Sequence, residues 1–232
     1  VSAKVATPDT TKLDISSLST IDEDGTTKLL LVGKDGKELA SAADGTEITA
    51  ILLNTPFHAE GGGQIGDTGI ITGAEGSIIV ENTKKLPEMS RGLGDVYKRQ
   101  VENTKKLPDG ITYIIGEVKE GIIRAGEEVN VVVDRDRREK LARNHTGTHM
   151  LQAALRRVLG DQVNQAGSLV LPDRLRFDFT WPEALSAKQI REVEDIVNAE
   201  IIKNTSVSIN EMPIDEAKNL GAMALFGEKY GD

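Results

Sequence analysis

The sequence of 232 residues has no cysteine, three histidines and an aromatic content of 3%. Without cysteine it can form neither a disulfide framework nor a metal site built on thiolates. It also lacks a run of about eighteen apolar residues that could span a bilayer, and its N-terminus has no basic segment followed by an apolar stretch. We therefore expect a protein that does not cross a membrane and that works in the cytoplasm.

The charge balance is acidic, with a formal net charge of −9 at pH 7 and 28% charged residues. Such a balance argues against a surface coated with positive charge for nucleic acid, and we expect no DNA partner. A local basic cluster is present and consists of Arg135, Arg137, Arg138, Lys140 and Arg143. This cluster leaves RNA binding open, although a solvated helix start gives the same pattern.

A change in the spacing of apolar residues divides the chain into three parts. Residues 1–27 are rich in Ser, Thr, Asp and Lys, which predicts a linker or lead-in. Residues 28–135 contain short apolar runs, such as 77–80 and 111–116, that are separated by glycine-containing turns. Runs of this kind without intervening helices predict an antiparallel sheet closed as a small barrel or sandwich, and we favour a β-barrel domain.

Helical and strand-like periods alternate in residues 136–232, which predicts an α+β domain with helices on an antiparallel sheet. The expected elements are a helix at 136–159, a hairpin of strands 168–171 and 175–179, a helix from 186 to 204, a strand at 206–210 and a short helix at 214–220. The second helix starts with Ser186-Ala187-Lys188-Gln189, which has the pattern of a capping box. The fold class predicted for the whole chain is α+β.

A duplication interrupts the first of these domains, since the run Val80–Pro87 recurs without change as Val101–Pro108. Solenoid repeats diverge and need about three copies to bury a core, so this duplication does not indicate a repeat fold. We interpret residues 88–100 as an artefactual insert that forms a disordered loop without function, and a natural hairpin insertion is the alternative. The ends at Val1 and Asp232 look cut, so we expect a fragment.

His145 and His149 stand four residues apart inside the first predicted helix, so both imidazoles leave the same face one turn apart. Two nitrogens placed in this way can converge on one zinc ion, which normally takes at least three protein ligands. The further ligands must then be carboxylates or lie outside the sequence. No glutamate follows His145, which excludes the HExxH pattern of metalloproteases. Two histidines that are satisfied by hydrogen bonds at the edge of the core are the alternative.

The segment Thr55–Gly69 is rich in glycine, and the pair Gly62–Gly63 precedes Gln64. Glycine lets a phosphate or a ribose approach the backbone closely, but the segment lacks the Gly-Lys-Ser/Thr end of a nucleotide-binding P-loop. A tight turn is the simpler explanation for most of these glycines. Further along, Gln165 and Ser168 open the predicted hairpin, where polar groups either cap strands or line the mouth of a pocket.

Four runs follow one another along the chain, namely Thr55–Gly69, Arg143–Leu155, Gln165–Val170 and Leu175–Phe179. Together they resemble the editing region of alanyl-tRNA synthetases. The resemblance implies hydrolysis of the ester that joins a wrong amino acid, serine or glycine, to tRNA(Ala). It also implies that ATP-dependent charging belongs to another part of such a synthetase. The terminal run 222–232 is similar to the segment that precedes the family's Cys-x-x-x-His motif.

By the same resemblance, His145 and His149 supply half of the ligands of one Zn2+ ion, and a later cysteine and histidine beyond Asp232 supply the rest. We therefore expect the chain itself to bind zinc weakly or not at all. The residues that the resemblance assigns to catalysis in the editing pocket are Thr148, Gln165 and Ser168. The residues expected to contact the substrate or the tRNA are Gly62, Gly63, Gln64 and Arg143. A free-standing deacylase that acts in trans and an inert tRNA-binding module of the same fold are the alternatives.

Overall fold

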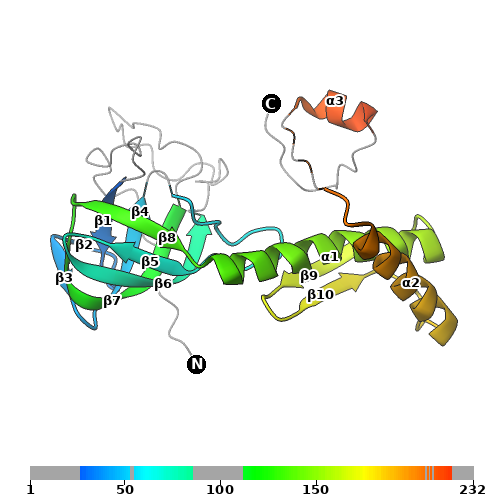
Figure 1. Cartoon of the computed structure of the whole chain (residues 1–232), viewed down its shortest axis with the longest axis horizontal. Coiled ribbons are helices and arrows are strands. Elements are labelled where there is room, and N and C mark those ends of the chain that lie inside the picture. Colours follow the sequence, from blue (N-terminus) through cyan, green and yellow to red (C-terminus); the bar gives the residue numbers. More distant parts are fainter. Residues whose placement is uncertain are drawn as a thin grey trace, which may run out of the picture.

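The computed structural model of the chain describes residues 27–52, 55–85, 112–206, 208, 210 and 212–220. Its first half contains the strands β1 (Thr27–Val32), β2 (Glu38–Leu39), β3 (Ser41–Ala43), β4 (Glu47–Leu52), β5 (Gly69–Thr72), β6 (Glu75–Lys85), β7 (Thr112–Arg124) and β8 (Glu128–Val133). Its second half consists of α1 (Arg135–Leu159), β9 (Gln165–Val170), β10 (Leu175–Phe179), α2 (Ala187–Lys203) and α3 (Ile214–Asn219). The strands of the first half lie at one end of α1, and the β9–β10 hairpin and α2 lie along the rest of this helix (Figure 1).

The first half forms one 8-stranded sheet in the order β2-β1-β4-β7-β6-β5-β8, with β3 paired to β7. The strand pairs are antiparallel, as the short apolar runs and turns predict. β1 also pairs with β8 over Thr27↔Val129 and Lys28↔Glu128, which joins two distant strands of this order. The antiparallel sheet and the α+β class are therefore confirmed. The barrel stays a prediction, because the pairing between β1 and β8 is short.

Many apolar residues of the sheet pack into one cluster. Leu31, Ile71, Ile78 and Ile114 are fully buried, with an exposed fraction of 0% each. β4 is buried at every position after Glu47, because it lies between β1 and β7. Burial of each large aliphatic side chain contributes about 1.5–3 kcal/mol, so this cluster holds the sheet together.

β6 and β7 have 11 and 13 residues and are longer than the apolar runs 77–80 and 111–116 that predict them. Their pairing shifts register between Ser77 and Ile78 and again between Val80 and Asn82. A β-bulge at each shift changes which residues face the core, so the alternation of apolar and polar residues breaks while the strand continues. The sequence therefore revealed only the regular part of each strand.

Helix α1 has 25 residues and begins where the sequence predicts. The Asp134 side chain caps it by accepting a hydrogen bond from the Arg137 backbone N–H at 3.0 Å, and Asp136 places a negative charge in its first turn. The helix ends at Gly160, whose φ of 106° no other residue type adopts readily. Because α1 starts directly after β8, it carries the chain from the sheet into the second half.

A second cluster of buried residues forms between α1, α2 and the hairpin. Ala154, Leu155 and Leu159 of α1 meet Val193 of α2, and Phe177 packs against them from β10. Among the described residues, the sheet and the second half thus each contain a cluster of buried apolar side chains. The division into domains at residues 135 and 136 stays a prediction.

The predicted hairpin, the second helix and the short third helix are confirmed. Ser186 caps α2 in a capping box with Gln189, and Asn204 ends the helix in the left-handed conformation with a φ of 47°. The strand predicted at 206–210 is wrong for the residues that can be judged, since Ser206, Ser208 and Asn210 lie in no strand. A strand needs a partner for its backbone groups, and none of the described strands pairs with this segment.

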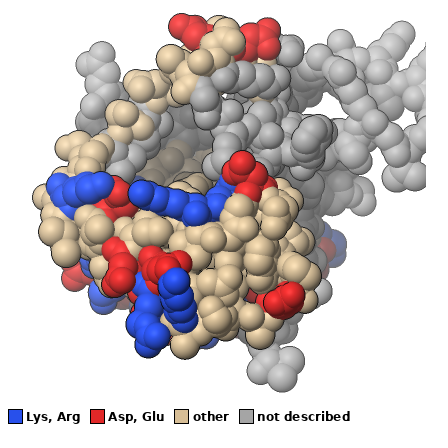
Figure 2. Space-filling model, turned by 90° about the vertical axis from the view of Figure 1, so that its right-hand side faces the viewer, with Lys and Arg blue, Asp and Glu red and all other residues tan. Residues whose placement is uncertain are grey.

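Three predictions fall outside the described residues, namely the lead-in before Thr27, the artefactual insert at 88–100 and the terminal run 222–232. Within the described ranges, no helix combines the length and the apolar character that crossing a bilayer requires. On the end of the molecule near α2, positive and negative side chains lie next to one another, and neutral surface lies around these groups (Figure 2). This face therefore presents no single field of positive charge among its described residues.

Candidate functional site

The glycine-rich loop, defined as residues 55–68, connects β4 to β5 and turns sharply at its tip. The Gly61 N–H donates to the Gln64 carbonyl at 3.0 Å, and the Gln64 N–H donates back to the Gly61 carbonyl at 2.9 Å. Between them, Gly62 and Gly63 have φ values of 57° and 80°. Two successive positive φ angles define a type I′ turn, which glycine adopts without strain. The tight turn that the sequence favours is thus present at this pair.

This loop bridges the sheet and the β9–β10 hairpin. On the sheet side, the Glu60 N–H donates to the Thr83 carbonyl of β6 at 2.7 Å. On the hairpin side, the Val170 N–H of β9 donates to the Gly63 carbonyl at 2.8 Å. A Cβ atom added at Gly63 would lie 2.8 Å from the carbonyl oxygen of Ser168. Glycine at position 63 therefore serves both the turn and the close approach to β9.

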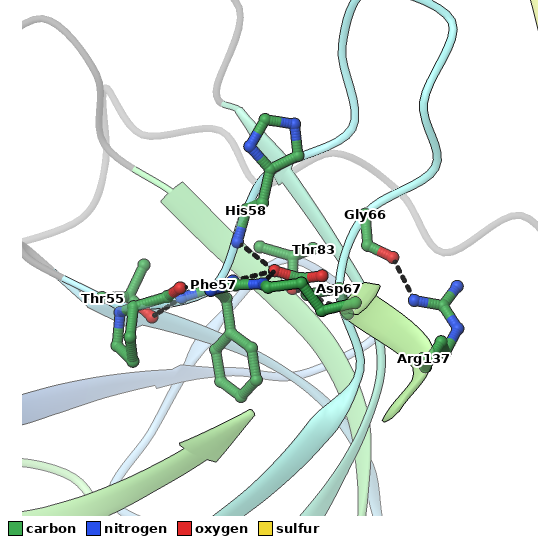
Figure 3. A network of polar contacts seen from close by, with 9 residues as sticks. Thr55, Phe57, His58, Gly66, Asp67, Thr83 and Arg137 are labelled. Carbon is green, nitrogen blue, oxygen red and sulfur yellow. Dashed lines mark hydrogen bonds and ion pairs between the residues drawn. The ribbon is translucent and has the colours of Figure 1, made fainter. Parts of the chain in front are cut away.

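Asp67 ties the loop to the first turns of α1. Its side chain is 1% exposed, and its Oδ2 accepts hydrogen bonds from the His58 backbone N–H at 2.6 Å and from Arg138 Nε at 2.9 Å. The Thr83 hydroxyl donates to the Asp67 backbone carbonyl at 3.0 Å. Arg137 Nη1 donates to the Gly66 carbonyl at 2.9 Å, while the His58 imidazole points away from the carboxylate (Figure 3).

The basic cluster that the sequence offered for RNA is therefore partly used inside the molecule. Arg137 and Arg138 hold the loop through Gly66 and Asp67. Arg143 is exposed and pairs with Glu139 at 3.8 Å, a long contact of the kind that contributes little. Of these three arginines, Arg143 is thus the one with a guanidinium that remains open to a partner.

His145 and His149 lie one turn apart on α1, with their rings stacked at a centroid distance of 5.2 Å and an interplanar angle of 15°. Nδ1 of His145 lies 2.7 Å from Oε1 of Gln64, which comes from the tip of the glycine-rich loop and is 8% exposed. An amide oxygen only accepts hydrogen bonds, so Nδ1 of a neutral His145 carries the proton and Nε2 keeps its lone pair. This tautomer suits metal binding through Nε2.

The pKa of His145 is lowered from the usual 6.5, mainly by burial and further by the nearby histidines His149 and His58. His145 is consequently neutral at pH 7, which is the form that coordinates metals. His58 thus lies close enough to His145 to act on it electrostatically, as His149 does. It lies in a segment far from α1 in sequence, so no spacing rule could have revealed its proximity.

The pair fits half of a zinc site. Zinc is usually held by four ligands in a tetrahedron, and imidazoles one helical turn apart supply two of them. Within the described residues, no group of three or more His, Cys, Asp or Glu side chains could hold a metal ion. The zinc site stays a prediction.

Ser168 and Gln165 lie on β9 and share one face of the hairpin. In the register, Ser168 is opposite Phe177 and Gln165 is opposite Phe179, and a bulge separates the two pairs. Directly paired residues project to the same face, so the bulge brings together two residues that a regular strand would place on opposite faces. The Ser168 Oγ is buried and has no hydrogen-bond partner among the described residues. Gln165 is exposed.

Thr148, the third residue assigned to catalysis, is 6% exposed on α1. Its hydroxyl donates to the Asn144 carbonyl of the preceding turn at 2.9 Å. With its proton engaged in this way, the hydroxyl has only acceptor capacity left. Among the residues expected in the site, direct contacts of the glycine-rich loop bring together Gln64, Gly63, His145 and Ser168.

The sheet with its loop and α1 has counterparts among known proteins. The family described as tRNA synthetases class II (A) matches residues 4–137, which include the glycine-rich loop and end in the first turn of α1. The chain belongs to this family of class II tRNA synthetases.

Alanine–tRNA ligases are among the proteins similar to this chain. That of Acetivibrio thermocellus is 46% identical over 211 residues, which are 91% of this chain and 22% of the relative. That of Thermus thermophilus is 47% identical over 196 residues, 84% of this chain and 20% of the relative. That of Desulfitobacterium hafniense is 44% identical over 207 residues, 89% of this chain and 21% of the relative. The chain thus spans about a fifth of the length of these relatives.

Proposed function

We propose that the chain is the editing region of an alanyl-tRNA synthetase and hydrolyses the ester of serine or glycine wrongly attached to tRNA(Ala). The observation that carries the proposal is that the glycine-rich loop joins His145 on α1 to Ser168 on β9, through Gln64 and Gly63. Likeness to alanine–tRNA ligases over about nine tenths of the chain supports it. The family match itself stops before His145, so the proposed centre depends on the geometry.

The need for such a site follows from the size of alanine. A pocket for a methyl side chain cannot fully reject glycine, which is smaller, or serine, whose hydroxyl adds little bulk, so a second hydrolytic site supplies the discrimination. In the proposed site the Ser168 hydroxyl, which lacks a partner among the described residues, hydrogen-bonds the substrate. Thr148 accepts a hydrogen bond from the seryl hydroxyl. Gln165 binds the substrate from the same face of the hairpin as Ser168.

His145 and His149 would hold the zinc ion, together with ligands outside the described residues. The ion, when bound, supplies a Lewis acid for the ester carbonyl or for a water molecule. Gln64 keeps His145 in the tautomer with an unprotonated Nε2, and burial keeps this imidazole neutral. The residues of this chain thus orient the ligands before any ion arrives.

The remaining parts of the proposal concern the surroundings of the site. The tip of the glycine-rich loop, Gly62 and Gly63, and the exposed guanidinium of Arg143 contact the tRNA. Residues 28–135 form a β-barrel domain and residues 136–232 an editing domain. Charging with ATP takes place in another part of the synthetase, in the cytoplasm.

The test is deacylation by the complete gene product that contains this chain. We expect it to hydrolyse seryl-tRNA(Ala) and glycyl-tRNA(Ala) much faster than alanyl-tRNA(Ala). H145A/H149A should lower the rate more than about 100-fold, because even the loss of a group that only supports a metal ligand costs about 10–100-fold. Lys188→Ala on α2, whose side chain is 84% exposed, is the control and should leave the rate unchanged. Full activity of the double variant would refute the proposed site.

An inert tRNA-binding module is the second candidate, because no third metal ligand accompanies the histidine pair among the described residues. Tight tRNA binding without turnover by the complete protein would favour it. A free-standing deacylase that acts in trans is a weaker candidate, since the similar proteins are ligases about five times as long as the matched region. The reading frame of the gene on both sides of this chain distinguishes that candidate.

A further inference from the structure

A pocket of 460 Å³ lies beside the proposed editing centre, at the junction of the glycine-rich loop, the end of β6 and β9. The residues that matter in its wall are Glu60, Gly61 and Gly63 of the loop, Lys84 and Lys85 of β6, and Ser168 of β9. Ser168 and Gly63 belong to the proposed centre as well. The pocket therefore shares two residues with that centre and has two lysines beside them.

The charge of the wall is positive, although the protein as a whole is acidic. Lys84 Nζ lies 3.9 Å from Glu60 Oε2, well beyond the 2.7–2.9 Å of a charge-assisted hydrogen bond. Both side chains are about half exposed, so this pair leaves the ammonium able to bind another acceptor. Lys85 is exposed and has no carboxylate partner among the described residues. The lining thus includes two lysines and one glutamate.

The loop backbone at and beside this wall has little steric cover. A Cβ atom added at Gly61 would meet only the Ala59 carbonyl, at 3.8 Å, and one added at Gly62 would meet nothing within 4 Å. The backbone at the tip of the loop is thus open to a ligand. Ser168 also lines the pocket, and its buried hydroxyl has no hydrogen-bond partner among the described residues.

We propose that Lys84 and Lys85 bind the phosphate backbone of the 3′-terminal nucleotides of the tRNA and thereby position its aminoacyl ester next to Ser168. The inference rests on the proposed function and adds two residues that no motif indicated. Ammonium groups suit phosphates as point charges, and open glycine backbone allows a ribose to approach. Phosphate contacts fix the register of a nucleic acid without reading its bases.

Salt-dependent binding of uncharged tRNA(Ala) to the complete protein tests this inference. For K84A/K85A we expect a Kd about 10-fold higher near physiological salt, and a slope of log K against log salt that falls by about 1.4, since each phosphate contact to a single strand contributes about 0.7. K84R/K85R, which keeps both charges, should retain most of the affinity. With seryl-tRNA well below saturation, the rate of hydrolysis by K84A/K85A should fall about 10-fold together with the affinity, because less tRNA is bound and positioned.

K34A/K37A is the matched control, because it also removes two lysines and both lie on the surface. Their carboxylate partners are close, at 2.7 Å for Lys34 with Glu47 and 3.3 Å for Lys37 with Asp35. Equal losses of affinity in the two double variants, or no loss in K84A/K85A, would overturn the inference. If the wild type binds tRNA through these lysines but hydrolyses no seryl-tRNA, the lysine site stands and the proposed editing function fails.

Discussion

Gln64 holds His145 in place: its side-chain oxygen Oε1 lies 2.7 Å from Nδ1 of His145, although the two residues are 81 positions apart in the chain. Gln64 is itself fixed, because its backbone closes the turn with Gly61 and bridges to Val170 of β9. The loop therefore holds the amide at a fixed place beside the imidazole. Gln64 sets the tautomer of His145 rather than only contacting a substrate.

Replacing Gln64 by Leu should release this tautomer. The leucine cannot accept a hydrogen bond, so the Nε2–H form of His145 becomes populated in the metal-free chain. The measurement is a two-bond ¹H–¹⁵N correlation spectrum of the histidine side chains. In the complete protein the same change should lower zinc affinity about 10–100-fold. Gln165→Leu, a change at an exposed glutamine, should affect neither, and an unchanged His145 spectrum in Q64L would contradict the role of Gln64.

Asp67→Asn should destabilise the chain by about 3 kcal/mol, because it breaks the ion pair with Arg138. This cost is near the lower end of the range for buried ion pairs, since Asp67 is 1% exposed but Arg138 is 38% exposed. The neutral amide leaves the guanidinium without its counter-charge and weakens the acceptor for the His58 N–H. Urea unfolding measures the loss. Glu75→Gln breaks the exposed pair with Arg124 and should cost less than about 1 kcal/mol. Similar costs for both variants would show that Asp67 does not fix the loop.

Local signals made much of the fold predictable. The apolar residues whose spacing predicts α1 all lie within that helix, and the capping box of α2 lies within four consecutive residues, so the sequence alone sufficed for both helices. β6 and β7 were predicted too short because their bulges interrupt the alternation that identifies a strand.

The candidate site was predictable only in part, because the sequence signals are local and the site combines residues from separate elements. His145 and His149 lie one turn apart on one helix, and their spacing is visible in the sequence. The approach of His58 to His145, and the bond between Asp67 and Arg138 across 71 positions, depend on how the loop packs on α1. The spacing of residues in the sequence does not indicate such contacts, because they form only when the loop packs on α1.

Gly63→Ala should be more destabilising than Gly36→Ala, although both glycines have nearly the same φ, 80° and 79°. A left-handed conformation costs an alanine about 1–2 kcal/mol at either position. At Gly36 the new Cβ meets nothing within 4 Å, whereas at Gly63 it lies 2.8 Å from the Ser168 carbonyl oxygen. The clash adds about 1–3 kcal/mol, as overpacking does in a core. Equal unfolding free energies in urea for the two variants would mean that the loop does not pack closely on β9.

The lowered pKa of His145 gives the metal-free chain a pH-dependent stability. The unfolded chain binds a proton at this histidine near pH 6.5, whereas the folded chain binds it only at lower pH, because burial and the neighbouring histidines His149 and His58 disfavour the imidazolium. Between the pKa values of the folded and the unfolded chain, the unfolded state binds more protons, so the free energy of unfolding falls as the pH drops below 6.5. Above pH 6.5 the contribution of His145 to stability is fully present. His145→Gln should flatten this dependence in urea unfolding measured from pH 7.5 to 5. An NMR titration of the wild type should give His145 a midpoint below 6.5, and a midpoint at or above that value would show that the imidazole is not held in its neutral form.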